Sequence, residues 1–323
     1  DASGSDVRRI TNSDSTEEFP RWSTDGQRIV FDSDLLGNLD IYTMDADGSN
    51  VVRLTSNPEG ELFADWSPDG TQIVYGTALS FGPLELFVMN ADGSGQHQIT
   101  ESGGLSLYPR WAKSSFQDMP TVPSNTSIAF ASNREGETDI YRMEPTGNHA
   151  YRLTDNPARD EAPSWSPNGR LIAFQSFRDG NGEIYVMEAS GLRQRNLTSN
   201  PSLDGNPTWS PNGTLIAFES DRSGNDEIYV MNSDGNEPKN LTNRPGRDFG
   251  PTWSPDGQSI GFVTSRYGGL EVAVMDADGS NVRQLTTNQA ISFRPAWSPD
   301  GQIIAFESSV DGDFGVYLIQ ADG

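Results

Sequence analysis

The sequence has 323 residues, with 46 acidic side chains against 22 basic ones and a formal net charge of −24, and only Lys113 and Lys239 among the basic residues are lysines. A chain this acidic has no long-range attraction for nucleic acid or anionic lipid, and no stretch approaches the roughly 18 consecutive apolar residues that suggest a membrane span. Cysteine is absent, which excludes disulfides and thiolate chemistry, and the two histidines, His97 and His149, leave little for acid–base catalysis or zinc.

The chain opens with one short predicted strand, residues 7–11, which is followed by seven repeats. Each repeat centres on a tryptophan, and the spacings are 44, 45, 54, 44, 44 and 44 residues between Trp22, Trp66, Trp111, Trp165, Trp209, Trp253 and Trp297. The long spacing reflects about ten additional residues between Trp111 and Ile128, which are either a contact site or a tolerated loop. A period of this length indicates a repeat architecture.

Each unit carries the pattern of β-strands rather than helices. In the fifth unit we predict strands over residues 206–210, 215–220, 227–231 and 239–242, separated by turns such as Pro211-Asn-Gly213. Four antiparallel strands in about 44 residues are typical of a propeller blade. The sequence therefore predicts an all-β fold, a single seven-bladed β-propeller that spans residues 1–323.

The two ends of the chain predict how the ring closes. Gln320-Ala-Asp-Gly323 stands at the same repeat phase as Asp1-Ala-Ser-Gly4, so the last unit lacks a fourth strand. We predict that residues 5–11 supply that strand to the seventh blade and leave no free sheet edge. The alternative is donation of this strand to a neighbouring molecule, which would build a polymer.

The repeated phrases resemble those of the TolB-like, WD-repeat-like propeller family. The resemblance rests on Phe249-Gly-Pro-Thr-Trp-Ser-Pro-Asp-Gly257 and on Ile216-Ala-Phe-Glu-Ser-Asp-Arg-Ser-Gly-Asn-Asp-Glu-Ile-Tyr-Val-Met231, and the repeat covers the whole chain. It implies a propeller and a periplasmic or extracellular setting. Similar repeats occur in TolB, in prolyl-oligopeptidase-type enzymes, in some polysaccharide lyases and in cell-surface proteins, so the resemblance leaves the function open.

A first acidic series lies five residues before most of the tryptophans: Glu17, Glu61, Asp160, Asp204 and Asp248. Ring closure would gather these acids around one mouth of the central channel, where a cation or basic partner groups would relieve their repulsion. The alternatives are a solvated acidic rim, or acids that accept backbone hydrogen bonds at the start of each strand.

Aromatic residues lie close to the first acidic series in sequence: Phe19, Phe63, Tyr108, Phe249 and Phe293. They are candidates for a partly exposed surface that binds a peptide or a sugar. The alternative is that they fill the channel or pack between neighbouring blades.

A second acidic series follows most of the tryptophans by 18 residues: Asp40, Asp139, Glu183, Glu227 and Glu271, with Glu85 one residue later in its unit. Arg134, Arg178, Arg222 and Arg266 stand five residues earlier in their own units. Because this arrangement repeats from unit to unit, we predict structural ion pairs within hairpins rather than a pair of catalytic carboxylates.

Two turns resemble fragments of calcium-binding loops. Asp45 and Asp47 lie in one, Asp276 and Asp278 in the other, and both lack the downstream glutamate of a complete loop. We interpret them as turns, with Ca²⁺ as the one candidate cofactor, and otherwise expect none.

The sequence contains no G-x-S-x-G motif, and both histidines fall near the fourth strand of their units. We therefore predict a non-catalytic scaffold that binds a protein or peptide, or a carbohydrate, at the channel mouth, with self-assembly as a further candidate and no nucleic-acid partner or membrane insertion. The alternatives are the propeller domain of a larger hydrolase or lyase, and a subunit of a surface-layer or filament assembly.

Overall fold

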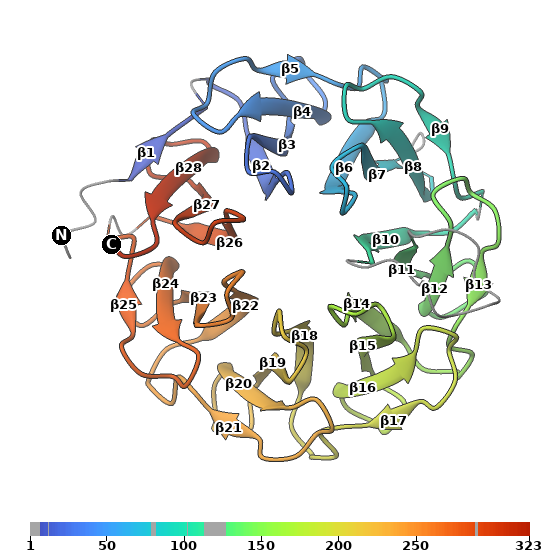
Figure 1. Cartoon of the computed structure of the whole chain (residues 1–323), viewed down its shortest axis with the longest axis vertical. Helices are drawn as coiled ribbons and strands as arrows, with labels where there is room; N and C mark the ends of the chain where they lie inside the picture. Colours follow the sequence, from blue (N-terminus) through green and yellow to red (C-terminus); the bar gives the residue numbers. More distant parts are fainter. Residues whose placement is uncertain (1–6, 12, 79–81, 102, 113–126, 288–289) are drawn as a thin grey trace.

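A computed structural model describes residues 7–11, 13–78, 82–101, 103–112, 127–287 and 290–323. Within these ranges the chain forms 28 strands and no helix. The strands make seven antiparallel sheets of four strands each, arranged as blades around one axis (Figure 1). The predicted fold, an all-β seven-bladed propeller, is confirmed.

The four strands of each blade run in order from the axis to the outside. The inner strands are β2 (Glu17–Trp22), β6 (Gly60–Trp66), β10 (Ser106–Trp111), β14 (Asp160–Trp165), β18 (Asp204–Trp209), β22 (Asp248–Trp253) and β26 (Ser292–Trp297). The second strands are β3 (Arg28–Ser33), β7 (Gln72–Ala78), β11 (Ile128–Ser132), β15 (Leu171–Ser176), β19 (Leu215–Ser220), β23 (Ser259–Thr264) and β27 (Ile303–Ser308). The third strands are β4 (Asp40–Asp45), β8 (Leu84–Asn90), β12 (Asp139–Met143), β16 (Glu183–Glu188), β20 (Glu227–Asn232), β24 (Glu271–Asp276) and β28 (Gly315–Gln320).

The outer strands are only two residues long: β5 (Val52–Arg53), β9 (His97–Gln98), β13 (Tyr151–Arg152), β17 (Arg195–Asn196), β21 (Lys239–Asn240), β25 (Arg283–Gln284) and β1 (Arg8–Arg9). They are shorter than predicted because the threonine of the repeated Leu-Thr pair accepts the third strand's amide hydrogen bond with its side-chain hydroxyl group and not with its backbone. In blade 5, the Ile228 amide donates to Thr242 Oγ1 (3.0 Å). The ladder therefore ends on a hydroxyl group.

Closure of the ring joins the first strand to the last blade. Strand β1 pairs antiparallel with β28, with Arg8 opposite Leu318 and Arg9 opposite Tyr317, and the Ile10 amide donates to the Val316 carbonyl oxygen (3.0 Å). The prediction that the N-terminal strand completes blade 7 is confirmed for residues 7–11, while residues 5 and 6 lie outside the described residues. Figure 1 shows β1 and β28 side by side.

The hydrophobic core lies between neighbouring blades. Val74 and Leu86 of blade 2, for example, pack in one cluster with Phe130 and Tyr141 of blade 3. The tryptophans tie adjacent inner strands together, since Trp66 Nε1 donates to the Arg21 carbonyl oxygen (3.3 Å) in the preceding blade. Because a blade is apolar on both faces, only stacking around the ring buries it.

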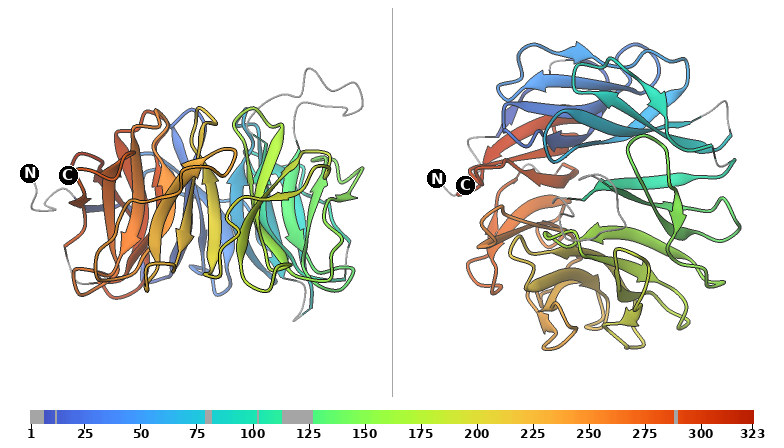
Figure 2. Two further views of the ribbon diagram at one scale, coloured as in Figure 1. Left: turned by 90° about the horizontal axis from the view of Figure 1, so that it is seen from below. Right: turned by 45° about the vertical axis from the view of Figure 1, so that its right-hand side comes forward.

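Seen edge-on, the molecule is a disc with two faces (Figure 2). The loops that lead into the inner strands, and those between second and third strands, share the face that we call the loop face. The tight turns between the first and second strands, and those between the third and fourth strands, share the opposite face, the turn face. The insertion between Trp111 and Ile128 lies mostly at positions 113–126, outside the described residues.

Candidate functional site

Every inner strand carries a β-bulge three residues before its tryptophan. The register with the second strand shifts there, as between Glu18 and Arg21 in β2. The bulge residue of each blade adopts a left-handed conformation, with φ between 49° and 65°. These seven residues, which we call the axial ring, are Phe19, Phe63, Tyr108, Ala162, Asn206, Gly250 and Arg294. Because most of them are not glycine, the fold must offset a cost of about 1–2 kcal/mol at each such position.

Three of the five predicted aromatic residues meet in the axial ring. The ring centroids of Phe19 and Phe63 are 4.8 Å apart in an edge-to-face arrangement, and those of Phe63 and Tyr108 are 5.4 Å apart. Tyr108 is 41% exposed, and the other two are half-buried. This aromatic arc covers blades 1–3, whereas blades 4–6 contribute the small or polar residues Ala162, Asn206 and Gly250.

The other two predicted aromatics occupy a different position. Phe249 and Phe293 stand one residue before the bulge. Phe293 packs against Phe314 of its own blade, with ring centroids 5.3 Å apart, and the guanidinium group of Arg247 lies 5.7 Å from the centroid of Phe249. They do not join the aromatic arc.

Arg294 is an axial-ring residue that the sequence analysis missed. Its guanidinium group stacks on Phe19, 3.6 Å from the ring centroid, and its Nη1 forms a 2.8 Å ion pair with Glu307 Oε2. Glu307 is fully buried and also accepts a hydrogen bond from the Phe19 amide. Burial raises the pKa of Glu307 to about 7, and the charge of Arg294 opposes that rise.

The bond that the Phe19 amide donates to Glu307 is one of three similar contacts between adjacent blades in the described part of the chain. The Phe63 amide donates to Asp32 Oδ2 (2.9 Å), and the Gly250 amide donates to Glu219 Oε1 (2.7 Å). In each case a second-strand carboxyl group holds the bulge of the following blade. Burial raises the pKa of Asp32 and of Glu219.

The structure corrects the prediction for the first acidic series. Glu17, Glu61, Asp160, Asp204 and Asp248 are at most 2% exposed, so they do not line an open channel mouth. Arginine side chains cover three of them: Arg178 Nη2 lies 2.9 Å from Asp160, Arg222 Nη2 lies 2.7 Å from Asp204, and Arg266 pairs with Asp248. Arg9 of β1 lies 3.8 Å from Glu17. Apart from Glu61, these acids are buried ion pairs at the start of the inner strands rather than a solvent-facing ring.

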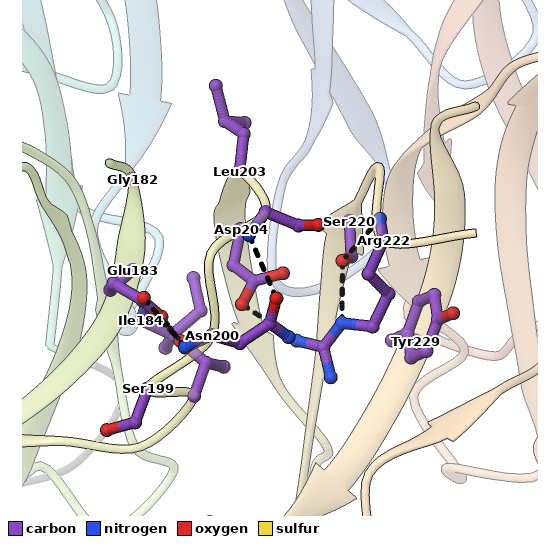
Figure 3. A network of polar contacts seen from close by, with 12 residues as sticks. Gly182, Glu183, Ile184, Ser199, Asn200, Leu203, Asp204, Ser220, Arg222 and Tyr229 are labelled. Carbon is purple, nitrogen blue, oxygen red and sulfur yellow. Dashed lines mark hydrogen bonds and ion pairs between the residues drawn. The ribbon is translucent and has the colours of Figure 1, made fainter. Parts of the chain in front are cut away.

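The partners predicted for the second acidic series are also wrong, because Arg178, Arg222 and Arg266 turn to the first series instead. Figure 3 shows Arg222 reaching Asp204 while Glu183 of the preceding blade lies nearby. The second series accepts hydrogen bonds mainly from the threonine of the Leu-Thr pair, as when Thr154 Oγ1 donates to Asp139 (2.9 Å). Asp139 also pairs with Arg152, and Asp40 with Arg53, both from outer strands.

Glu61 departs from this pattern. The position that holds Arg178 in blade 4 is Leu79 in the sequence of blade 2, so no arginine is available there. Burial, with a contribution from the nearby charge of Asp40, raises the pKa of Glu61 to about 7.

The turn acids are engaged within their own turns. Asp47 Oδ1 accepts bonds from the amide and hydroxyl groups of Ser49 (2.9 and 2.6 Å), and Asn281 donates to Asp276 (2.7 Å). The bonds from Ser49 and Ser280 lower the pKa of Asp47 and of Asp278. Asp278 therefore has the same role in the second turn as Asp47 has in the first. Asn50 donates to Asp45 in the first turn (2.6 Å), as Asn281 does to Asp276 in the second. No group of three or more metal-ligating side chains occurs among the described residues, and calcium binding stays a prediction.

The two histidines lie on the outer part of the disc. The His97 ring bonds the carbonyl oxygens of Gly95 and Pro145 (3.0 Å each), and His149 lies 3.4 Å from Glu144. Neither joins the axial ring. Across the described ranges there is also no helix long and apolar enough to cross a membrane.

Seven blades closed by an N-terminal strand define this protein as a seven-bladed β-propeller. The family described as "TolB beta propeller domain" matches residues 1–80, 155–248 and 237–323, and the chain belongs to this family. No curated protein matches the sequence.

Several solved structures share the fold at low identity. An oligogalacturonate lyase from Vibrio parahaemolyticus is 13% identical with a TM-score of 0.76, over 97% of this chain and 93% of its own. TolB from Acinetobacter baumannii is 19% identical with a TM-score of 0.57, over 94% and 78%. A puromycin-hydrolyzing peptidase from Mycobacterium tuberculosis is 15% identical with a TM-score of 0.74, over 99% of this chain but 53% of the peptidase.

Proposed function

We propose that this propeller is a non-catalytic binding module that takes a segment of a partner protein against its axial ring, from the loop face. The observation that carries the proposal is the aromatic arc of Phe19, Phe63 and Tyr108, three adjacent rings that remain partly exposed at the centre of the disc. Exposed aromatic clusters of this kind supply much of the energy of protein recognition.

The backbone beneath the arc is held rigidly. Asp32 and Glu307 fix the amides of Phe63 and Phe19 through bonds that cross between blades. A ligand would therefore meet side chains that are already positioned, which lowers the entropy cost of binding. Membership of the TolB propeller family supports a protein as the partner and a location outside the cytoplasm, in the periplasm or the extracellular medium.

Selection of short random peptides on the intact chain tests this proposal. We expect recovered peptides to bind the wild type and to lose at least about tenfold in affinity when Tyr108→Ala or Phe63→Ala removes part of the arc. Leu192→Ala is the matched control, because Leu192 is a 64% exposed apolar residue on the turn face. Failure to recover any peptide, or equal binding by Tyr108→Ala, would count against the proposal.

A second candidate is the propeller domain of a larger hydrolase or lyase. The observation in its favour is the likeness to a peptidase of which this chain covers only 53%, and to an oligogalacturonate lyase along nearly its whole length. Incubation of the chain with oligogalacturonates and with unstructured peptides distinguishes the two candidates. Turnover of either substrate would refute a non-catalytic module.

A further inference from the structure

One role of the 20 arginine side chains in this protein is to neutralise buried acids. Seven of them pair with a carboxyl group that is buried: Arg9 with Glu17, Arg53 with Asp40, Arg152 with Asp139, Arg178 with Asp160, Arg222 with Asp204, Arg266 with Asp248, and Arg294 with Glu307. Other partly buried arginines have no such partner and donate to neutral oxygens instead, as when Arg28 donates to the Ala91 carbonyl oxygen and Arg134 to Ser132 Oγ.

Arg21 and Arg110 are two such arginines, and each stands two residues after a ring of the aromatic arc in the same strand. Each stands immediately before the tryptophan of an inner strand, Arg21 in β2 and Arg110 in β10, and each is half-buried. Among the described residues neither guanidinium group has a carboxylate within 4.0 Å. Arg110 Nη1 donates to the carbonyl oxygen of Pro109 (3.0 Å).

Arg21, Asp65 and Arg110 occupy the same position in three successive inner strands, which Trp66 and Trp111 join by donating to the carbonyl oxygens of Arg21 and Asp65 (3.3 and 3.2 Å). Burial, followed by the charge of Arg110, lowers the pKa of the Arg21 guanidinium to about 10, while Asp65 of the intervening blade acts in the opposite direction. The equivalent residues of blades 4, 5 and 6 are Ser164, Thr208 and Thr252, which carry no charge. At this position the positive charge is therefore confined to blades 1 and 3, with Asp65 between them in blade 2.

At the strand position just before the tryptophan, blades 1–3 carry two arginines and one acid, which favours an anion there. Arg294 already lies 2.8 Å from Glu307 and 3.9 Å from Glu18, which leaves Arg21 and Arg110 against Asp65. A ligand carboxylate placed between the two arginines would supply the missing negative charge. It would also fill hydrogen-bonding capacity that Arg21 does not use within the described residues, and charge-assisted bonds of this type are the stronger ones.

We propose that the axial site recognises a carboxylate that is presented next to an apolar side chain on a peptide, with Arg21 and Arg110 binding the carboxylate and the aromatic arc binding the apolar group. This inference rests on the proposed function and narrows its ligand. The rings favour a peptide over an acidic sugar, because Phe19 and Phe63 meet at 87° and Phe63 and Tyr108 at 49°, so they offer no single flat face for a sugar ring.

The test uses the peptides selected on the intact chain. We expect them to share an Asp or Glu adjacent to an apolar residue, and replacing that acid by its amide should weaken binding at least about tenfold. Arg21→Gln should weaken binding similarly. When the Arg21→Gln protein is combined with the amide-substituted peptide, the fold-loss in affinity should be smaller than the product of the two separate losses. Arg110→Gln is the second variant. Arg28→Gln is the matched control, since Arg28 is a half-buried arginine of β3 that bonds the Ala91 carbonyl oxygen and stacks on Trp66.

The outcomes separate this inference from the function on which it rests. The carboxylate site would be overturned, and peptide binding left intact, by either of two results. In the first, the selected peptides depend on Tyr108 without sharing an Asp or Glu; in the second, they bind Arg21→Gln and Arg110→Gln as tightly as the wild type. Recovery of no peptide would overturn both. Binding of trigalacturonate, measured by calorimetry and lost in Arg21→Gln, would replace the peptide by a sugar acid. A thermal melt of each variant must show that it is folded.

Discussion

At the scale of single residues, buried carboxyl groups decide how the protein responds to pH. Glu61 and Glu307 are fully buried, and each has a pKa raised to about 7. An unfolded chain releases these protons near 4.5, whereas the folded chain holds them to about 7. The folded state thus binds more protons across this window, so the contribution of these groups to stability is greatest below pH 4.5 and falls as the pH rises towards 7.

Glu61→Gln should remove part of this dependence. Between pH 5 and 6.5, we expect the free energy of unfolding of the wild type to fall more steeply than that of the variant, by up to about 1.4 kcal/mol per pH unit. Urea unfolding at several pH values measures the two slopes. Asp47→Asn, a change at an exposed turn acid, is the control and should leave the slope in this window unchanged; parallel slopes for wild type and Glu61→Gln would contradict the assignment.

Arg222, which covers Asp204, should contribute far more to the free energy of unfolding than an arginine on the surface. Arg222→Ala leaves the carboxylate of Asp204 buried without its partner, and we expect a loss of about 3 kcal/mol in unfolding free energy. Arg193→Ala breaks the ion pair with Glu188, in which Arg193 is 84% exposed, and should cost less than about 1 kcal/mol. Similar losses in the two variants would show that the Arg222 pair is not a buried one.

The sequence placed the ion pairs in the correct blades but joined the wrong partners. Arg222 stands five residues before Glu227 and 18 after Asp204, and spacing alone favours the nearer acid. In the fold, Asp204 pairs in register with Ser220, which brings Arg222 across the hairpin to it. Glu227 instead accepts a hydrogen bond from the Thr242 hydroxyl group. To choose between the two carboxylates as the partner of Arg222, one must know the register between the first and second strands of the blade, and the sequence pattern does not give it.

At the scale of the strand, the bulge of the inner strand creates the candidate site. It turns the side chains of the axial ring out of the regular alternation, and it exposes an amide that Asp32, Glu219 or Glu307 holds in three of the junctions. The strands themselves were predictable from turns and alternation. The bulge was not, because the left-handed positions hold residues such as Phe19, Tyr108 and Arg294, which do not ordinarily mark such a conformation.

Gly250 is the axial-ring residue best suited to its backbone conformation, with φ of 65°. Gly250→Ala should therefore destabilise the protein by about 1 kcal/mol, although the added methyl group would meet nothing closer than 3.9 Å. Gly60→Ala is the comparison, since a methyl group there also has its nearest neighbour at 3.9 Å and no left-handed conformation is involved. Chemical denaturation of the two variants checks the difference; equal stabilities would mean that the bulge imposes no strain.

At the scale of the whole molecule, the ring depends on a short N-terminal strand. The pairing of β1 with β28 covers the only outer edge that blade 7 would otherwise expose, and Ile10 is buried in the junction with blade 1. The sequence predicted this closure because the two termini share one repeat phase. It did not predict what the centre of the disc binds, since ligand choice depends on a few axial side chains rather than on the repeat.

Removal of residues 1–11 should open the ring. We expect the truncated chain to melt at a lower temperature and to associate through the exposed edge of β28, as unpaired strands do. Size-exclusion chromatography and a thermal melt measure both effects, and a synthetic peptide of residues 1–11 added in excess should reverse them. A truncated chain that stays monomeric with an unchanged melting temperature would show that β1 is dispensable.

Site-specific photocrosslinking can show whether a peptide binds at the axial ring. A photoreactive benzoyl-phenylalanine in place of Tyr108, in the otherwise intact chain, should crosslink the selected peptide on illumination, and the same group in place of Leu192 on the turn face should not. Crosslinking at position 192 with none at position 108 would contradict peptide binding at the axial ring.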